Sequence, residues 1–167
     1  QKTAYEISTR DWSSDVCSSD LSGSGALTLS GSNTYSGGTT VLAGEVLGNS
    51  ASLQGNIVTS ASTGVWFVQS TAGTYAGNLS GGGALAKVGG GTLTLSGSNS
   101  FSGGTYLGIP WLFGVESGTV SLGSAGAIGS SGTISFDGGT LQFSASNTTD
   151  YSGRFSSSAG QQYKMDR

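Results

Sequence analysis

Two stretches of the chain, 25–39 and 91–105, have the most regular alternation of apolar and polar positions. Each contains a Leu-Thr-Leu run, whose period of two places both leucines on one face of a β-strand. A Ser-Gly-Ser-Asn corner, one aromatic residue and a Gly-Gly pair follow, and such glycines permit a positive φ. The two stretches are identical at 12 of 15 positions. They therefore predict an internal repeat made of one strand and two corners.

The predicted repeat residues occupy matching positions in the two copies. They are Leu27, Leu29, Asn33, Tyr35, Gly37 and Gly38 in the first copy, and Leu93, Leu95, Asn99, Phe101, Gly103 and Gly104 in the second. One such strand cannot bury its leucines alone, and stacking on further strands solves this problem, as in solenoids. The copies start 66 positions apart, which divides into three turns of roughly 22 residues. We therefore expect an all-β fold, a right-handed parallel β-helix (β-solenoid) of about six to seven turns, with the handedness taken from the general rule for crossovers.

The other apolar runs of the chain are also short, rich in β-forming residues and separated by glycine, serine or asparagine. Residues 41–48, 52–58 and 64–69 are examples, and no apolar stripe of period 3.6 indicates a helix. A disordered linker would have a similar content of glycine and serine. Linkers lack regularly placed Leu, Val, Ile and aromatic residues, however, so we favour the solenoid.

The asparagine and the aromatic residue of each copy could also be interpreted as ligand-binding residues. Asn33 and Asn99 can instead hydrogen-bond side chain to side chain at a stacked corner, where Asn also tolerates a left-handed backbone. Tyr35 is replaced by Phe101 in the second copy, which has no hydroxyl group, and this exchange favours packing over a sugar-binding platform. We therefore expect both pairs of residues to be structural.

The repeat resembles a known family. Gly-Thr-Leu-Thr-Leu-Ser-Gly-x-Asn-x-Tyr/Phe-Ser-Gly-Gly-Thr is similar to the autotransporter-associated β-strand repeat (passenger-associated repeat) of secreted passenger regions in Gram-negative and related bacteria. Residues 73–88 resemble the family's lead-in segment and residues 118–129 its trailing segment, so the resemblance covers most of residues 22–167. It implies a β-helical stalk exported to the cell surface, with an outer-membrane barrel expected elsewhere in the full gene. It implies no particular reaction.

On this interpretation the chain is a non-enzymatic structural segment of a secreted or surface-displayed, outer membrane-anchored passenger, with adhesion as a further candidate role. Its partners would be neighbouring repeats of the same chain, with host-surface or polysaccharide ligands as candidates, and neither a cofactor nor a metal is expected. Residues 151–156 and 163–165 repeat the pattern of residues 75–80 and 86–88, without the Gly-Thr-Leu-Thr-Leu run that follows there. We therefore expect an uncapped fragment of a longer array.

The second copy is followed by a break in the pattern. Residues 107–114, Leu-Gly-Ile-Pro-Trp-Leu-Phe-Gly, stand before the strand pattern resumes at residue 115, and they contain the only proline, which argues against a central strand. We expect a loop that leaves the coil and exposes its apolar side chains, which makes it a candidate binding loop. Those side chains are Ile109, Trp111, Leu112 and Phe113. A sequence error and a locally buried loop are the alternatives.

Residues 1–21 differ from the rest of the chain. They lack its glycine spacing and hold four of the nine acidic residues and the only cysteine. Residues 10–21 also resemble a standard short-read sequencing adapter translated in one frame. We therefore expect residues 1–21 to be a non-native leader, an assembly artefact, with a genuine polar leader as the alternative. The predicted organisation is this leader followed by one β-solenoid repeat segment over residues 22–167.

Composition narrows the classes of function. The net charge is −3, or −1 without residues 1–21, which leaves five acidic and four basic residues. No basic patch is available to neutralise phosphates, so nucleic-acid binding is not expected. The chain has no histidine, and its one cysteine lies in the leader, which removes the usual general base and thiol nucleophile.

The alternative function is that of a β-helical carbohydrate-active enzyme, a polysaccharide lyase or hydrolase. Asp137 and Asp150 would form its carboxylate pair, and this requires both to project from adjacent turns. Arg154 and Glu116 are the other charged candidates. Both aspartates stand in corner-like contexts, next to Gly-Gly and Asn-Thr-Thr, which favours solvated turn residues.

Overall fold

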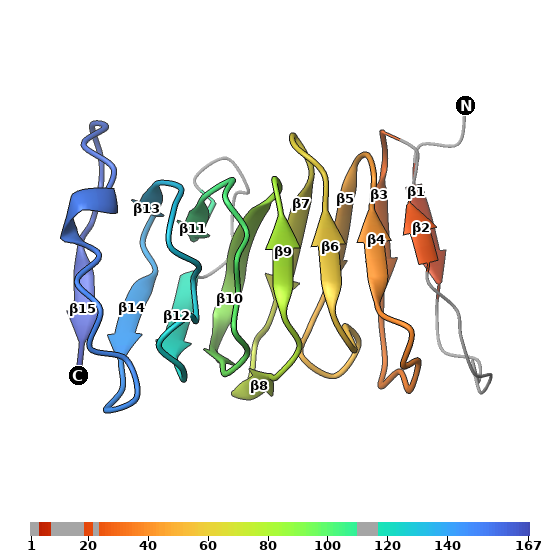
Figure 1. Ribbon diagram of the computed structural model, residues 1–167, viewed down its shortest axis with the longest axis horizontal. Coiled ribbons are helices and arrows are strands. Elements are labelled where there is room, and N and C mark those ends of the chain that lie inside the picture. Colours follow the sequence, from red (N-terminus) through yellow and green to blue (C-terminus); the bar gives the residue numbers. More distant parts are fainter. Residues whose placement is uncertain (1–3, 8–18, 22–23, 110–116) are drawn as a thin grey trace.

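The computed structural model describes residues 4–7, 19–21, 24–109 and 117–167. These residues form short strands joined by corners, with one 3-10 helix among them, η1 (Ser152–Arg154). The strands are β1 (Ala4–Ile7), β2 (Ser19–Leu21), β3 (Ala26–Leu29), β4 (Thr39–Val41), β5 (Glu45–Gly48), β6 (Ile57–Thr59), β7 (Gly64–Val68), β8 (Gly73–Tyr75), β9 (Leu79–Gly81), β10 (Ala84–Leu95), β11 (Thr105–Leu107), β12 (Ser117–Leu122), β13 (Ile134–Phe136), β14 (Thr140–Phe143) and β15 (Lys164–Asp166). Figure 1 shows them stacked in one row, from β1 at one end to β15 at the other.

Successive turns of the chain stack as parallel strands, and every pairing between the described strands is parallel. One turn runs through β7, β8 and β9, and these strands define three faces. Face I contains β1, β3, β5, β7, the first half of β10, β11 and β13. Face II contains β8, the second half of β10, β12, β14 and β15, and face III contains β2, β4, β6 and β9. The predicted all-β parallel solenoid is confirmed, with about seven turns.

The length of a turn follows from the register between stacked strands. On face I, Ala26 pairs with Glu45 and Glu45 with Gly64, so these two turns are equal in length. The turn from Thr105 to its partner Ile134 is longer than the turns before and after it by eight or nine positions. This longer turn contains the predicted insertion, residues 107–114, although its first residue, Leu107, still belongs to β11. The extra residues therefore enlarge one turn without shifting the strands that follow.

The core is a set of inward-pointing rows that run through the stack. Alternate residues of each strand point inward. The rows include Val46, Val65 and Leu85 on face I, Leu93, Val120 and Leu141 on face II, and Ile57 and Leu79 on face III, each at most 2% exposed. Burying one such side chain stabilises the fold by roughly 1.5–3 kcal/mol. Since each turn is covered only by its neighbours, this stabilisation depends on adjacent turns staying in register.

β10 joins two faces through a glycine corner and holds a buried lysine there. Gly89 has a φ of +84°, and the register of β10 with β12 is irregular between Gly89 and Thr92. The side chain of Lys87 is fully buried. Its Nζ donates hydrogen bonds to the carbonyl oxygens of Val88 (2.9 Å) and Gly89 (2.5 Å). A third bond, of 3.1 Å, reaches the carbonyl of Gln69 in the preceding turn, so the ammonium group ties the corner to the turn beneath it.

Burial makes the stability of this corner depend on pH. Desolvation lowers the pKa of Lys87 from 10.5 to about 8 in the folded protein. Between these values the unfolded chain holds the proton more strongly than the folded one, so the free energy of unfolding rises with pH, by at most about 1.4 kcal/mol per unit. We expect denaturant titrations from pH 7 to 10 to show this rise in the parent chain and to show less of it in Lys87→Met. Parallel curves for the two proteins would contradict the assignment.

The strands β1 and β2 lie within the predicted leader. β1 pairs with β3 and β2 with β4, each in a parallel register. These pairings place residues 4–7 on face I and residues 19–21 on face III. The predicted boundary at residue 22 and the predicted artefact stay predictions, and so does the right-handed sense of the coil.

Candidate functional site

The two copies of the repeat lie on different faces of the coil. Leu27 stands on face I, in the row that continues through Val46 and Val65 to Leu85. Leu93 stands on face II, paired with residues of β8 and β12. The 66 positions between the copies therefore span three turns, from Leu27 to Leu85, and a further segment that carries the chain onto the next face. The prediction of about three turns in this distance holds, but the turns are 19, 19 and 20 residues long instead of roughly 22, and the remaining residues lead onto the next face.

The corner asparagines bond to backbone rather than to each other. Asn33 Nδ2 donates to the carbonyl of Ser52 at 2.8 Å. Asn99 Nδ2 donates to the carbonyl of Ala127 at 2.5 Å, and its Oδ1 accepts from the N–H of Leu79 at 2.7 Å. Each side-chain amide thus links its corner to the backbone of an adjacent turn. These bonds take the place of the expected hydrogen bonds between asparagine side chains.

The aromatic residues at the next corner differ in their use of the hydroxyl group. Phe101 is 2% exposed and belongs to the core. Tyr35 is partly buried, and its hydroxyl accepts hydrogen bonds from Gln54 N at 3.0 Å and from Thr39 Oγ1 at 3.2 Å. The exchange of Tyr for Phe therefore removes two hydrogen bonds that the first copy makes.

Two different constraints require glycine in the Gly-Gly pairs of the two copies. The second glycine of each pair has a positive φ, of +78° at Gly38 and +118° at Gly104. At the first position of the second pair, Gly103, a Cβ atom would lie 2.5 Å from the carbonyl carbon of Gly83 in the adjacent turn. Gly37 is exposed at the corresponding position of the first copy. Backbone conformation and close approach between turns both require glycine here.

A third, degenerate copy of the repeat was not predicted from the sequence. Residues 140–151, Thr-Leu-Gln-Phe-Ser-Ala-Ser-Asn-Thr-Thr-Asp-Tyr, match the second copy but carry two extra residues between the asparagine and the aromatic residue. Leu141 stacks on Val120, which stacks on Leu93, so the third copy lies on the same face as the second. Asn147 Nδ2 donates to the carbonyl of Ser124 at 2.7 Å, again across turns. A search that allowed a two-residue gap would have found it.

The carboxylates proposed for the alternative enzyme do not project from adjacent turns. Asp137 and Asp150 follow each other in one turn, on opposite sides of β14. Partial burial raises the pKa of Asp137. The backbone N–H of Ser152 donates to Asp150 Oδ1 at 2.9 Å and lowers the pKa of that exposed carboxylate. Each aspartate thus has the surroundings of a separate corner residue, and Glu116 lies outside the described residues.

Arg154 is occupied by backbone carbonyls. Its Nε donates to Gly132 and its Nη1 to Gly129, both at 2.8 Å. Its Nη2 donates to Ile128 at 3.1 Å and also to Ser131. The guanidinium group therefore stabilises the corner formed by residues 128–132, which is a structural role.

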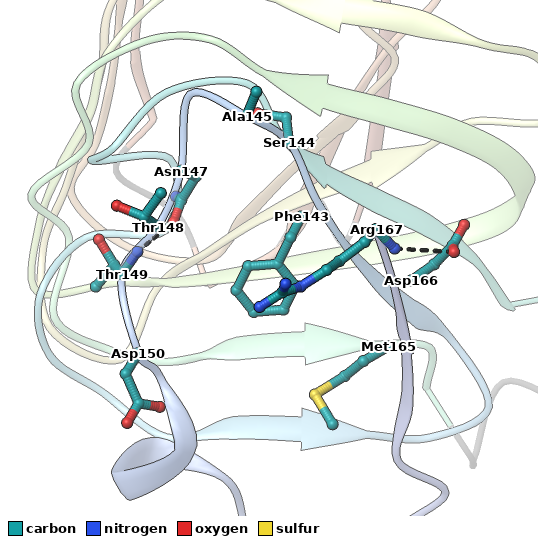
Figure 2. A pocket seen from close by; sticks show the side chains of 10 residues that line it. All are labelled: Phe143, Ser144, Ala145, Asn147, Thr148, Thr149, Asp150, Met165, Asp166 and Arg167. Carbon is teal, nitrogen blue, oxygen red and sulfur yellow. Dashed lines mark hydrogen bonds between the residues drawn. The ribbon is translucent and has the colours of Figure 1, made fainter.

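A hollow of about 850 Å³ lies at the β15 end of the stack. Figure 2 shows Asp150 and Asp166 on opposite sides of it, with Phe143 and Met165 between them. Arg167 also lines the hollow, and its backbone N–H donates to Asp166 at 2.9 Å. Since apolar side chains separate the two carboxylates, the hollow does not have the arrangement of a paired-carboxylate site.

The described residues were also searched for a metal site and a membrane-spanning helix. Among the residues with described positions, no group of three or more His, Cys, Asp or Glu could hold a metal ion. No helix in that part of the chain is long and apolar enough to cross a membrane.

Of the four apolar side chains predicted for the binding loop, only one lies among the described residues. This residue, Ile109, is 6% exposed and packs with Ala86 and Val88 on the outside of face I. Trp111, Leu112 and Phe113 lie outside the described residues, so the binding loop stays a prediction.

These features define a class of protein, a parallel β-solenoid whose corners carry a recurring asparagine, aromatic and glycine-pair motif. The passenger-associated-transport-repeat family matches the chain over residues 22–47 and 85–107, and each match contains one Leu-Thr-Leu strand of the motif. The chain therefore carries two matches to the repeat of autotransporter passengers. No curated protein and no solved structure matches it.

The different faces of the two copies predict different roles for their equivalent threonines. Thr39 Oγ1 donates to the hydroxyl of Tyr35, whereas Thr105 Oγ1 is buried with no hydrogen-bond partner among the described residues. An unpaired buried hydroxyl costs free energy that a methyl group of the same shape does not. We therefore expect Thr105→Val to raise the free energy of unfolding by about 1 kcal/mol and Thr39→Val to lower it. Urea titrations of both variants test this, and a loss of stability in Thr105→Val would show that its hydroxyl is satisfied.

Proposed function

We propose that the chain is a non-enzymatic stalk segment of a secreted or surface-displayed bacterial passenger. The observation that carries this proposal is the continuity of the inward rows through about seven stacked turns, which makes a rod of one repeated architecture. Each turn is hydrogen-bonded only to its neighbours, so the rod can lengthen turn by turn as the chain emerges. Such a rod holds a more distal part of the protein away from the cell surface. Folding outside the cell would also help export, because each new turn prevents the chain from sliding back.

The family supports this assignment. Passenger-associated-transport repeats are matched at two places in the chain. The localisation that follows is the surface of a Gram-negative-type bacterium, with an outer-membrane anchor encoded elsewhere in the gene. Host-surface or polysaccharide ligands are candidate partners of the passenger as a whole.

Removing one complete turn tests the stalk. Val65 pairs with Val46, so a deletion of residues 46–64 joins Glu45 to Val65 and leaves every later strand on its face. We expect the full-length protein with this deletion to reach the cell surface and resist protease as the parent does. Protease accessibility on whole cells measures both properties.

The matched control is a deletion of residues 46–55, which removes about half a turn. It displaces every following inward row from its face, so we expect loss of surface display and of protease resistance. If the complete-turn deletion is as damaging as the half-turn deletion, the chain is not a modular stalk.

The enzyme alternative is tested directly. The stalk proposal predicts that full-length protein carrying Asp137→Ala and Asp150→Ala keeps whatever polysaccharide-degrading activity the parent shows. Reducing-sugar release from a panel of polysaccharides measures this. Loss of an activity that the parent has would support the enzyme and contradict the stalk as the complete function of this segment.

A further inference from the structure

Two short motifs of the chain have the form Asn-x-Ser/Thr, the acceptor pattern for N-linked glycosylation. They occupy residues 78–80, Asn-Leu-Ser, and residues 147–149, Asn-Thr-Thr. Such short matches arise by chance in a chain rich in serine and threonine, so neither motif is evidence by itself. What distinguishes an acceptor is its surroundings, because the amide nitrogen of the asparagine must be reachable at the surface. The structure places the two motifs in opposite surroundings.

The asparagine of the 147–149 motif is enclosed. Asn147 is 2% exposed. Its Nδ2 donates hydrogen bonds to the carbonyl of Ser124 at 2.7 Å and to the hydroxyl of Tyr151 at 2.9 Å. Both Nδ2 protons are therefore engaged, and a sugar bonded to this nitrogen would need space inside the coil. In the folded chain this motif is not an acceptor.

The asparagine of the 78–80 motif is open to solvent. Asn78 stands at the corner between β8 and β9 and is exposed. Its Oδ1 accepts a hydrogen bond from the N–H of Ser98 in the next turn at 2.8 Å, which fixes the orientation of the amide because only its oxygen can accept. Its Nδ2 makes no hydrogen bond within the described part of the chain. The side chain is thus held at its oxygen and free at its nitrogen.

The neighbouring turns leave this amide uncovered. Asn56 in the preceding turn accepts a hydrogen bond at its Oδ1 from the backbone N–H of Asn78 (3.0 Å), and Ser98 holds the equivalent corner of the following turn. All three residues are exposed. Stacked turns are only about 4.8 Å apart, so a sugar on Nδ2 would project outward instead of separating them. A glycan at this corner is therefore compatible with the stacking of the rod.

The third residue of the motif faces the same side as its asparagine. Leu79 points inward and is 2% exposed, so the alternation of side chains turns both Asn78 and Ser80 outward. The backbone carbonyl of Ser80 accepts a hydrogen bond from Thr59 Oγ1 at 2.8 Å. The hydroxyl of Ser80 has no partner among the residues that the structure describes. A transferase can therefore contact the amide and the hydroxyl together on one short extended segment.

We propose that Asn78 is an acceptor site for an N-linked sugar on the folded rod. The donor is a sugar whose anomeric carbon is esterified to a pyrophosphate, as in nucleotide sugars and lipid-linked oligosaccharides. In the transfer, a bond forms between Asn78 Nδ2 and the anomeric carbon while the bond from that carbon to the phosphate oxygen breaks. The phosphate leaves with the electron pair, and a base of the transferase takes one proton from Nδ2. This site goes beyond the proposed stalk function and does not depend on it.

Transfer to the purified, folded chain tests the site in two arms. One arm uses a soluble N-glucosyltransferase with UDP-glucose, and the other uses a bacterial oligosaccharyltransferase with an undecaprenyl pyrophosphate-linked oligosaccharide. We expect at least one arm to add a single glycan, and peptide mapping by mass spectrometry to locate it at Asn78. The arm that succeeds identifies the class of donor. Synthetic peptides of residues 72–84 and 141–153 are matched controls, since both motifs should be modified outside the fold.

Variants of the third residue separate recognition of the motif from a structural effect. Ser80→Ala removes the hydroxyl but keeps the backbone carbonyl to which Thr59 donates. We therefore expect it to abolish transfer to Asn78 while the melting temperature stays close to that of the parent. Ser80→Thr restores a hydroxyl group and should restore transfer.

A second acceptor can be built in the preceding turn. Asn56 is exposed at the equivalent corner, and its Oδ1 likewise accepts a backbone N–H of the following turn. Its third position is Val58, which pairs with Ser80 and is 47% exposed. Val58→Ser completes the motif, so we expect this variant to receive one glycan at Asn56 and another at Asn78.

The proposal is overturned if the folded chain receives no sugar in either arm, whatever the peptides show. It is overturned equally if Asn147 of the folded chain is modified as readily as Asn78, or if transfer to Asn78 survives Ser80→Ala, because neither access nor the motif would then decide the site. Surface display of the full-length protein is measured separately. Normal display without an acceptor site leaves the stalk proposal intact.

Discussion

The structure depends on the parallel hydrogen bonding of each turn to the next. A single turn has too little apolar surface to fold alone, and it gains a core only when its inward residues meet those of the turns on either side. This requirement explains why the corners accept so few types of residue. At Gly103 a Cβ atom would meet the backbone of the adjacent turn, so the corner accepts only a residue without one. At Asn33 and Asn99 the side-chain amides complete the hydrogen bonding that the bent backbone cannot make alone.

The sequence predicted the class of fold because the rules that govern it are local. Alternating leucines, glycine pairs and the absence of a helical stripe lead directly to stacked strands. It did not predict which face each copy occupies, because turns of several different lengths all keep the register, and only the sum of many turns decides the face. The inward position of Lys87 was also not predicted from the sequence. A lysine within an alternating strand is expected to face solvent, and only the bulge at Gly89 brings three carbonyl oxygens to its ammonium group.

The outward-facing residues were predictable to a smaller extent than the core. Trp66 and Tyr106 belong to different turns, two strands apart, and nothing in their local sequence indicates that they share one row. The interior constrains only alternate residues of each strand, so the outer residues are free to differ from face to face. Face II shows this contrast, since its outer positions carry Thr92, Thr119 and Thr140 in one row. A rod with a uniform interior can therefore present different chemistry in different directions.

The placement of the two repeat copies on different faces has a consequence for how such rods change in evolution. Recombination between nearly identical copies would delete or duplicate the segment from the start of one copy to the start of the other, 25–90. That segment is not a whole number of turns, because it ends one face further round the coil. The fold would survive the exchange, since the motif is compatible with both faces. Everything beyond the junction would be rotated about the axis of the rod by one face, so a change in the number of repeats would also change the direction in which the distal surfaces point.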